Sequence, residues 1–115
     1  MKPQYPASPE SDDAHLNQTI IAQVYEHART IAAGKVLSYG ALGARCEPPI
    51  SGYICGRIMN GAMADVPWWR VVAKDGSLPI AKRNPILAKE QREKLESEGV
   101  QFGEDGKIKM AEFAN

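Results

Sequence analysis

Two cysteines, Cys46 and Cys55, are the residues of this 115-residue chain best suited to nucleophilic chemistry, provided that an activating group turns a thiol into a thiolate. They lie nine residues apart, which fits neither a Cys-x-x-Cys redox motif nor a Cys/His zinc site. Cys55 falls on the expected buried side of a helix, where cysteine behaves as a small apolar residue. No residue near Cys46 resembles an activating base. The sequence therefore predicts no metal and no cofactor.

Basic side chains are concentrated in the middle of the chain, where they could face an anionic partner. The whole chain has no formal net charge, but residues 29–83 hold eight lysines and arginines against three acidic residues, a local balance of +5. Binding to phosphates depends on a charged face rather than on the total charge. An ordinary solvated surface is the simpler explanation, so charge alone does not identify the partner.

The first third of the chain predicts a tail and one long helix. Residues 1–13 are rich in proline, serine and acidic residues, and we expect them to be mobile. A helix should run from about Ala14 to Ala33, with Asp13 as its N-cap and Gly34 at its end. Because the chain has neither a membrane-spanning apolar run nor a secretory signal, we expect no membrane contact. An intracellular location follows as an expectation, the cytoplasm in a bacterium or the nucleus in a eukaryote.

Two short helices joined by a turn are expected next. Ser38 can cap a helix over Tyr39–Arg45, and Ser51 can cap a second helix from Gly52 to about Ala62. Two prolines at positions 48 and 49 separate the helices, because proline has no backbone N–H to donate. The second helix should expose Arg57 and bury Ile54, Cys55, Ile58, Met59 and Ala62. This is the outline of a helix-turn-helix, although paired short helices are common in small domains.

The rest of the chain predicts short strands and one more helix. Residues 66–72 should turn into a short strand, and a turn at residues 74–76 should form a hairpin with residues 77–80. Asn84 and Pro85 should start a helix that ends at Gly99 and carries Leu87, Gln91 and Leu95 on one side. A small hairpin over residues 100–110 would complete an α+β or mainly α, winged-helix-like domain spanning residues 14–115.

Four segments of the chain, taken in order, resemble a known family. They are Gly34-Lys-Val-Leu-Ser-Tyr-Gly40, Gly61, Val66-Pro-Trp-Trp-Arg-Val-Val72 and Gln91-Arg-Glu-Lys-Leu-Glu-Ser-Glu-Gly-Val100. From about Leu16 to Met110 the chain is similar to the C-terminal domain of O6-alkylguanine-DNA alkyltransferases, and more closely to the alkyltransferase-like proteins. The enzymes carry Pro-Cys-His-Arg-Val, whose cysteine accepts the alkyl group, and the alkyltransferase-like proteins commonly replace that cysteine with tryptophan.

The resemblance implies a protein that is not an enzyme. Trp68 stands at the position of the acceptor cysteine, and an indole has no lone pair available for attack. Trp69 stands at the position of the activating histidine, and the family's buried glutamate is expected to fall at Arg92. Alternation along a strand should point Trp69 away from Trp68, and either ring could instead be an ordinary core aromatic.

The resemblance also implies two groups of site residues. The expected lesion pocket consists of Trp68, Trp69, Val71 and Arg83, with the Arg83 guanidinium stacked over a flipped base. The expected DNA-binding residues are Tyr39, Ser51, Tyr53, Arg57 and Arg70. Tyr39 matches a family tyrosine beside the target nucleotide's phosphate. Tyr53 occupies the position of an arginine finger that fills the gap left by the flipped base, and Arg57, one turn later, could share that role.

The implied function is recognition of O6-alkylguanine in double-stranded DNA. The domain, expected to be a monomer, would bind through the minor groove, flip the damaged base and mark it for nucleotide excision repair proteins. Two alternatives stay open. One is a residual DNA alkyltransferase that uses Cys46, and the other is a generic helix-turn-helix DNA binder or regulator.

Overall fold

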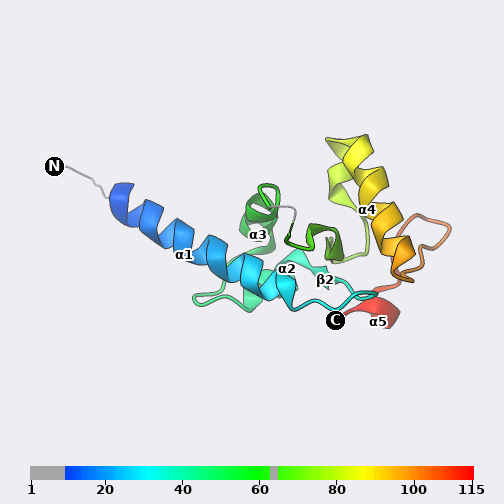
Figure 1. The fold of residues 1–115 in the computed structure, drawn as a ribbon, viewed down its shortest axis with the longest axis horizontal. Helices are drawn as coiled ribbons and strands as arrows, with labels where there is room; N and C mark the ends of the chain where they lie inside the picture. Colours follow the sequence, from blue (N-terminus) through cyan, green and yellow to red (C-terminus); the bar gives the residue numbers. More distant parts are fainter. Residues whose placement is uncertain (1–9, 63–64) are drawn as a thin grey trace.

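A computed structural model describes residues 10–62 and 65–115, which form a mainly helical domain with one very small sheet (Figure 1). In chain order the described elements are α1 (Glu10–Arg29), β2 (Leu37–Ser38), α2 (Tyr39–Ala44), α3 (Gly52–Met59), the 3-10 helix η1 (Trp68–Arg70), β3 (Val71–Val72), a second 3-10 helix η2 (Pro79–Lys82), α4 (Pro85–Ser97) and α5 (Met110–Phe113). The expected fold class is confirmed, including the helix-turn-helix.

Helix α1 begins and ends four residues earlier than expected. It starts at Glu10, so Asp13 lies inside the helix and is not its N-cap. Acidic residues near a helix N-terminus and basic ones near its C-terminus are favourable, and His27 and Arg29 occupy the last turn. The expected tail at 1–13 is therefore wrong for residues 10–13, while residues 1–9 lie outside the described part of the chain. The N-terminal part of α1 extends beyond the other elements (Figure 1).

The helix-turn-helix is built by two serine caps, as expected. The Ser38 hydroxyl accepts a hydrogen bond from the Ala41 backbone N–H, and the Ser51 hydroxyl accepts one from Ile54. The turn between α2 and α3 requires a glycine at Gly43, because a Cβ there would lie 2.4 Å from the Ile50 carbonyl oxygen. Helix α3 is shorter than expected and ends at Met59.

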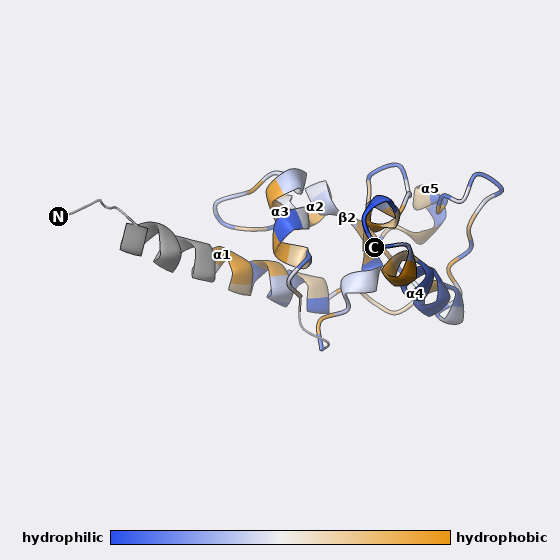
Figure 2. Ribbon diagram, turned by 90° about the horizontal axis from the view of Figure 1, so that it is seen from above, coloured by the Kyte–Doolittle hydropathy of each residue, from blue (hydrophilic) through white to orange (hydrophobic). Residues whose placement is uncertain are grey.

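Helix α3 buries only part of its expected apolar side. Cys55 and Met59 are buried and Ile58 is half-buried, but Ile54 is 44% exposed. Cys55 and Met59 belong to one hydrophobic cluster with Val24 and Ala28 of α1, with Ile31 just after α1, and with Leu42 of α2. This cluster forms the first of two hydrophobic cores. Apolar residues alternate with hydrophilic ones along both α1 and α3 (Figure 2).

The sheet is parallel and joins distant segments. Leu37 pairs with Val71 and Ser38 with Val72, so β2, which directly precedes α2, runs beside β3, which directly follows η1. The expected hairpin at residues 71–80 is wrong. A tight turn does form, with the Ala73 N–H donating to Ser77, but the following residues become η2 instead of a strand. Pro79 favours this outcome, because it cannot donate to a sheet ladder.

The second core lies between β3, α4 and the C-terminal segment. Helix α4 starts as expected, with the Asn84 side chain accepting from the Leu87 N–H and Pro85 in the first turn. It is mostly hydrophilic (Figure 2), but Gln91 and Leu95 are buried. The expected terminal hairpin is reduced to a single bridge between Phe102 and Ile108. The short helix α5, which the sequence patterns did not predict, then brings the C-terminus beside Val36.

Within the described residues, no helix is long and apolar enough to cross a membrane.

Candidate functional site

A cavity of about 210 Å³ lies between the helix-turn-helix, η1 and α4. Its lining residues are Tyr39, Met59, Asn60, Ala62, Trp68, Ile80, Leu87, Glu90 and Gln91. The walls are thus aromatic and aliphatic with a few polar groups, a composition found in small-molecule pockets. Of the residues expected in the lesion pocket, only Trp68 lines this cavity.

A wider groove of about 680 Å³ opens beside the cavity, between α3 and η2. It shares Tyr39, Asn60 and Ile80 with the cavity and adds Gly52, Tyr53, Gly56, Arg57, Pro79 and Arg83. The groove therefore presents two arginines and two tyrosines in front of the cavity.

Tyr39 is the aromatic residue common to the cavity and the groove. As the first residue of α2 it follows the Ser38 cap directly, and its ring passes close to Gly56 of α3. Burial raises the pKa of Tyr39, neighbouring Cys55 raises it further, and Arg83 acts in the opposite direction. The phenol therefore stays protonated near neutral pH and can donate a hydrogen bond to a phosphate oxygen.

Trp68 and Trp69 point into different parts of the molecule. Their rings are nearly perpendicular, at 87°, with centroids 6.1 Å apart. Trp68 packs against the first core and lines the cavity, whereas Trp69 packs against the second core. Trp69 and Trp68 thus pack on different cores, but both lie in the 3-10 helix η1 and not on a strand as expected, and Trp69, expected in the lesion pocket, does not line the cavity.

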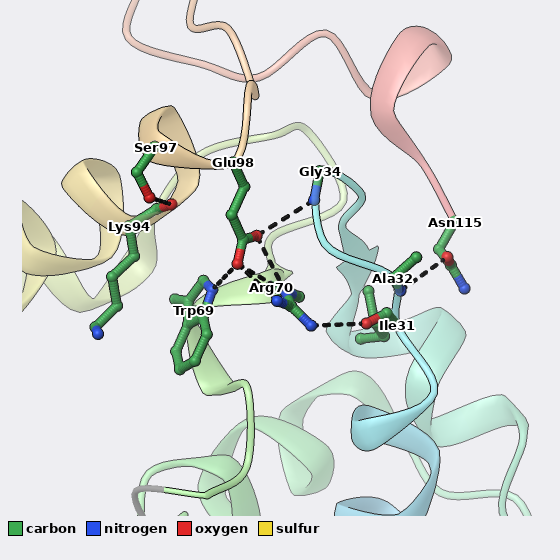
Figure 3. A network of polar contacts seen from close by, with 9 residues as sticks. All are labelled: Ile31, Ala32, Gly34, Trp69, Arg70, Lys94, Ser97, Glu98 and Asn115. Atoms are coloured by element: carbon green, nitrogen blue, oxygen red, sulfur yellow. Dashed lines mark hydrogen bonds and ion pairs between the residues drawn. The ribbon is translucent and has the colours of Figure 1, made fainter.

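Arg70 lines neither the groove nor the cavity. Its guanidinium forms an ion pair with Glu98 at 2.6 Å and donates to the Ile31 carbonyl at 2.9 Å (Figure 3). The Arg70 and Glu98 side chains are only 16% and 15% exposed. The expected DNA contact by Arg70 is therefore wrong, because the side chain is committed to holding α4 against the end of α1.

Glu98 accepts hydrogen bonds from three residues in two segments of the chain. Besides Arg70, it accepts from the indole N–H of Trp69 at 3.1 Å and from the Gly34 N–H at 3.3 Å (Figure 3). Burial would raise the pKa of Glu98, but the hydrogen bonds from Arg70, Trp69 and Gly34 outweigh it and hold the pKa below its usual range. Lys94 also lies over the Trp69 ring, 4.8 Å from its centroid.

The family's buried glutamate was expected at Arg92, but the side chain at this position is exposed. Arg92 pairs with Glu96 and covers the Phe102 ring. The carboxylate that holds the side chain at position 69 is Glu98. Val71, expected in the lesion pocket, is completely buried in the first core and lines neither the cavity nor the groove.

The residues expected at the base-flipping position lie on the exposed side of α3. Tyr53 is 71% exposed and lines the groove, and the Arg57 guanidinium lies 6.0 Å from its ring centroid. Ser51 is exposed at the start of the same helix, with its hydroxyl occupied as the N-cap. Tyr53 and Arg57 line the groove and Ser51 does not, and the contacts of all three with DNA stay predictions.

Arg83 lies at the edge of the groove, outside the cavity. Its guanidinium donates a 2.8 Å hydrogen bond to the Asn60 side chain, which follows the last residue of α3. Asn60 lines both hollows, so Arg83 is held beside the entrance. Its stacking over a flipped base stays a prediction.

Both thiols are placed where they are poor nucleophiles. Cys46 and Cys55 are buried in the first core, and neither lines the cavity. Burial raises the pKa of both, that of Cys55 to about 12. Cys46 lies just after α2 and is only 1% exposed. Across residues 10–62 and 65–115, no group of three or more His, Cys, Asp or Glu side chains could hold a metal ion.

Sequence reasoning missed Asn60 and Glu90 as site residues. Leu87, Glu90 and Gln91 are spaced i, i+3 and i+4, which places them on one side of α4 facing the cavity. That spacing was visible in the sequence. What it could not show was that this side of α4 faces Trp68 and Tyr39.

The chain is similar to proteins of known function over most of its length. Residues 19–100 match the family described as 6-O-methylguanine DNA methyltransferase, DNA binding domain. A DNA base-flipping protein of Vibrio parahaemolyticus serotype O3:K6 is 28% identical over 97 residues, which cover 81% of this chain and 92% of the relative.

Two solved structures from S. pombe share the fold. The structure of Atl1 in complex with damaged DNA containing O6-carboxymethylguanine has a TM-score of 0.71 and 27% identity, covering 85% of this chain and 95% of Atl1. The structure of ATL in complex with DNA has a TM-score of 0.71, 25% identity and the same coverage. With the family match spanning residues 19–100, these likenesses lead to one conclusion: the chain belongs to the family of the 6-O-methylguanine DNA methyltransferase DNA-binding domain.

Proposed function

We propose that this protein binds O6-alkylguanine in double-stranded DNA, flips it into the cavity beside Trp68 and does not remove the alkyl group. One observation carries the proposal: a cavity with an aromatic wall opens directly onto a groove beside α3, and no cysteine lines it. A protein that binds the lesion without repairing it could present it to nucleotide excision repair proteins, and this hand-off is part of the proposal.

The groove supplies what duplex binding needs. Arg57 and Arg83 can neutralise phosphates, and the Tyr39 hydroxyl can donate to a phosphate next to the flipped nucleotide. The cavity then offers the Trp68 ring, which can pack against a base or its alkyl group. Binding by one copy of the chain is sufficient for this arrangement.

The site chemistry supports binding over alkyl transfer. A direct transfer needs a nucleophilic atom that reaches the alkyl carbon. Trp68, which stands at the position of the acceptor cysteine by resemblance, has no such atom, because its indole has no lone pair available for attack. The buried thiols have raised pKa values and lie outside the cavity. A residual alkyltransferase that uses Cys46 is therefore the weaker candidate.

We predict that no alkyl adduct forms on the protein. After incubation with a duplex containing O6-methylguanine, intact-protein mass spectrometry should show an unchanged mass, and the lesion should be recovered intact from the DNA. A stoichiometric mass gain of one methyl group, mapped to any residue, would show that the protein is a transferase.

The decisive test of the proposal is the ratio of affinities for damaged and undamaged DNA. We expect a duplex with one O6-methylguanine to bind more tightly than the same duplex with guanine, because only the damaged base occupies the cavity stably. Fluorescence anisotropy at fixed salt measures both, since phosphate contacts make each affinity salt-dependent. Equal affinities would identify a generic helix-turn-helix DNA binder.

Replacing Arg83 should weaken lesion binding selectively. If its guanidinium stacks on the flipped base, Arg83→Ala should lose about 1–2 kcal/mol for alkylated DNA, the size of a desolvated cation–π contact, and much less for undamaged DNA. Lys82→Ala is the matched control, because Lys82 is an exposed neighbour on η2 that lines neither hollow. Equal losses on both duplexes would make Arg83 a plain phosphate contact.

A further inference from the structure

Glu90 gives the cavity an electrostatic character that the proposed function does not explain. It lines the cavity on α4, and no cationic side chain is among the lining residues. Glu90 also forms no ion pair within the described residues, whereas Glu96 and Glu98 on the same segment are both paired with arginines. The cavity wall therefore carries one carboxylate that has no ion-pair partner among the described residues, and because Glu90 is exposed, water screens its charge in the free protein.

Gln91 adds a second acceptor to the same side of the cavity. Its side-chain N–H₂ group donates to the carbonyl oxygens of Trp69 and Val71, both at 3.2 Å, which fixes the orientation of the amide. The amide oxygen is then left as an acceptor, and in residues 10–62 and 65–115 no donor is bonded to it. Gln91 is only 2% exposed, so this oxygen is a buried acceptor beside the cavity.

The basic groups near the site lie at the entrance and not in the wall. Arg83 is bonded to Asn60 at the edge, and Arg57 lies on the exposed side of α3. In a complex with DNA, these two guanidinium groups would pair with phosphates. DNA seated over the groove would also exclude water from the cavity, which strengthens the field of Glu90 on whatever group occupies it.

We propose that Glu90 selects the charge of the alkyl group, so that the cavity accepts neutral or cationic O6 adducts and disfavours anionic ones. This inference rests on the proposed function, because it assumes that the adduct enters the cavity. It sets this chain apart from a binder of O6-carboxymethylguanine, whose adduct would bring a second carboxylate against Glu90. Like charges placed together across an interface are a common device for rejecting a ligand.

Three adducts of similar size but different charge test the proposal. Duplexes would carry O6-carboxymethylguanine, which is anionic, O6-carbamoylmethylguanine, which is neutral, or O6-(2-aminoethyl)guanine, which is cationic. The wild-type protein should bind the neutral adduct roughly tenfold more tightly than the anionic one, and the cationic adduct at least as tightly as the neutral one. Anisotropy titrations at one salt concentration measure all three.

Two glutamine variants on α4 separate a local effect from a change in net charge. Glu90→Gln should bring the neutral-to-anionic affinity ratio close to one. Glu93→Gln removes the same charge from an exposed residue that has no ion-pair partner among the described residues and does not line the cavity, so it should leave the ratio unchanged. Glu90→Lys should reverse the preference.

The outcomes are distinguishable from a failure of the proposed function. If all adducts bind no better than plain guanine, both proposals are overturned. If the adducts are preferred over guanine but the neutral-to-anionic affinity ratio is near one, lesion recognition stands and charge selection by Glu90 is wrong. The same conclusion follows if a high ratio persists in Glu90→Gln. A ratio that Glu93→Gln abolishes equally would also overturn the role of Glu90.

Discussion

Glu98→Ala should destabilise the protein by about 3 kcal/mol, because it leaves the largely buried Arg70 guanidinium without its carboxylate. The same substitution removes the acceptor for Trp69 and Gly34, so the C-terminal end of α4 loses its hydrogen bonds to η1 and to the residues after α1, while the Gln91 bond to the Trp69 carbonyl stays in place. Urea unfolding followed by tryptophan fluorescence measures the loss. Glu96→Ala is the control, since that glutamate forms an exposed i,i+4 pair with Arg92 worth about 0.5 kcal/mol or less.

The contribution of Glu98 should also depend on pH with a defined sign. Its pKa in the folded protein lies below the usual carboxyl value of 4.5, so the folded state favours the charged form. The stabilisation is fully present above the usual value and is lost as the pH falls through the lowered one. The stability difference between wild type and Glu98→Gln should therefore be constant near neutral pH and shrink below about pH 4. A difference that grows on acidification, or a cost no larger than that of Glu96→Ala, would contradict the proposed role.

The parts of the fold that were predictable are those set by local hydrogen bonds. The caps at Ser38, Ser51 and Asn84 each bond a backbone N–H three residues later, so each is readable from a short segment. The start of α1 was not predictable in this way. Asp13 is a good N-cap by residue type, but acidic residues are equally favourable inside a first turn, and the helix continues to Glu10.

The parts that were missed depend on partners far apart in the chain. Arg70 looks like a DNA contact because it is basic and follows the tryptophan pair, but its partner Glu98 lies 28 residues later. The parallel pairing of β2 with β3 likewise joins residues that no local pattern connects, so the turn at residues 74–76 suggested a hairpin instead. Glu90 carries no sign of its role until α4 is placed beside Trp68.

Replacing Tyr53 should abolish base flipping while leaving general DNA binding largely intact. Tyr53 is a highly exposed aromatic residue on α3 at the groove, where its ring can enter the gap that a flipped base leaves. Unstacking a base costs on the order of a few kcal/mol per step, and an inserted side chain recovers part of that cost. In Tyr53→Ala the fluorescence of a base analogue at the target position should stay at the level of stacked DNA.

The salt dependence of binding tests whether Tyr53 or Arg57 fills the gap. Tyr53 carries no charge, so Tyr53→Ala should leave the slope of log affinity against log salt nearly unchanged. Tyr53→Arg should keep flipping and steepen this slope by the amount expected for about one additional phosphate contact. Arg57→Ala should reduce the slope and preserve the fluorescence signal, because the Arg57 guanidinium lies 6.0 Å from the Tyr53 ring centroid and can reach the backbone beside it. If Tyr53→Ala leaves flipping intact and Arg57→Ala destroys it, the side chain that fills the gap is Arg57, one turn further along α3.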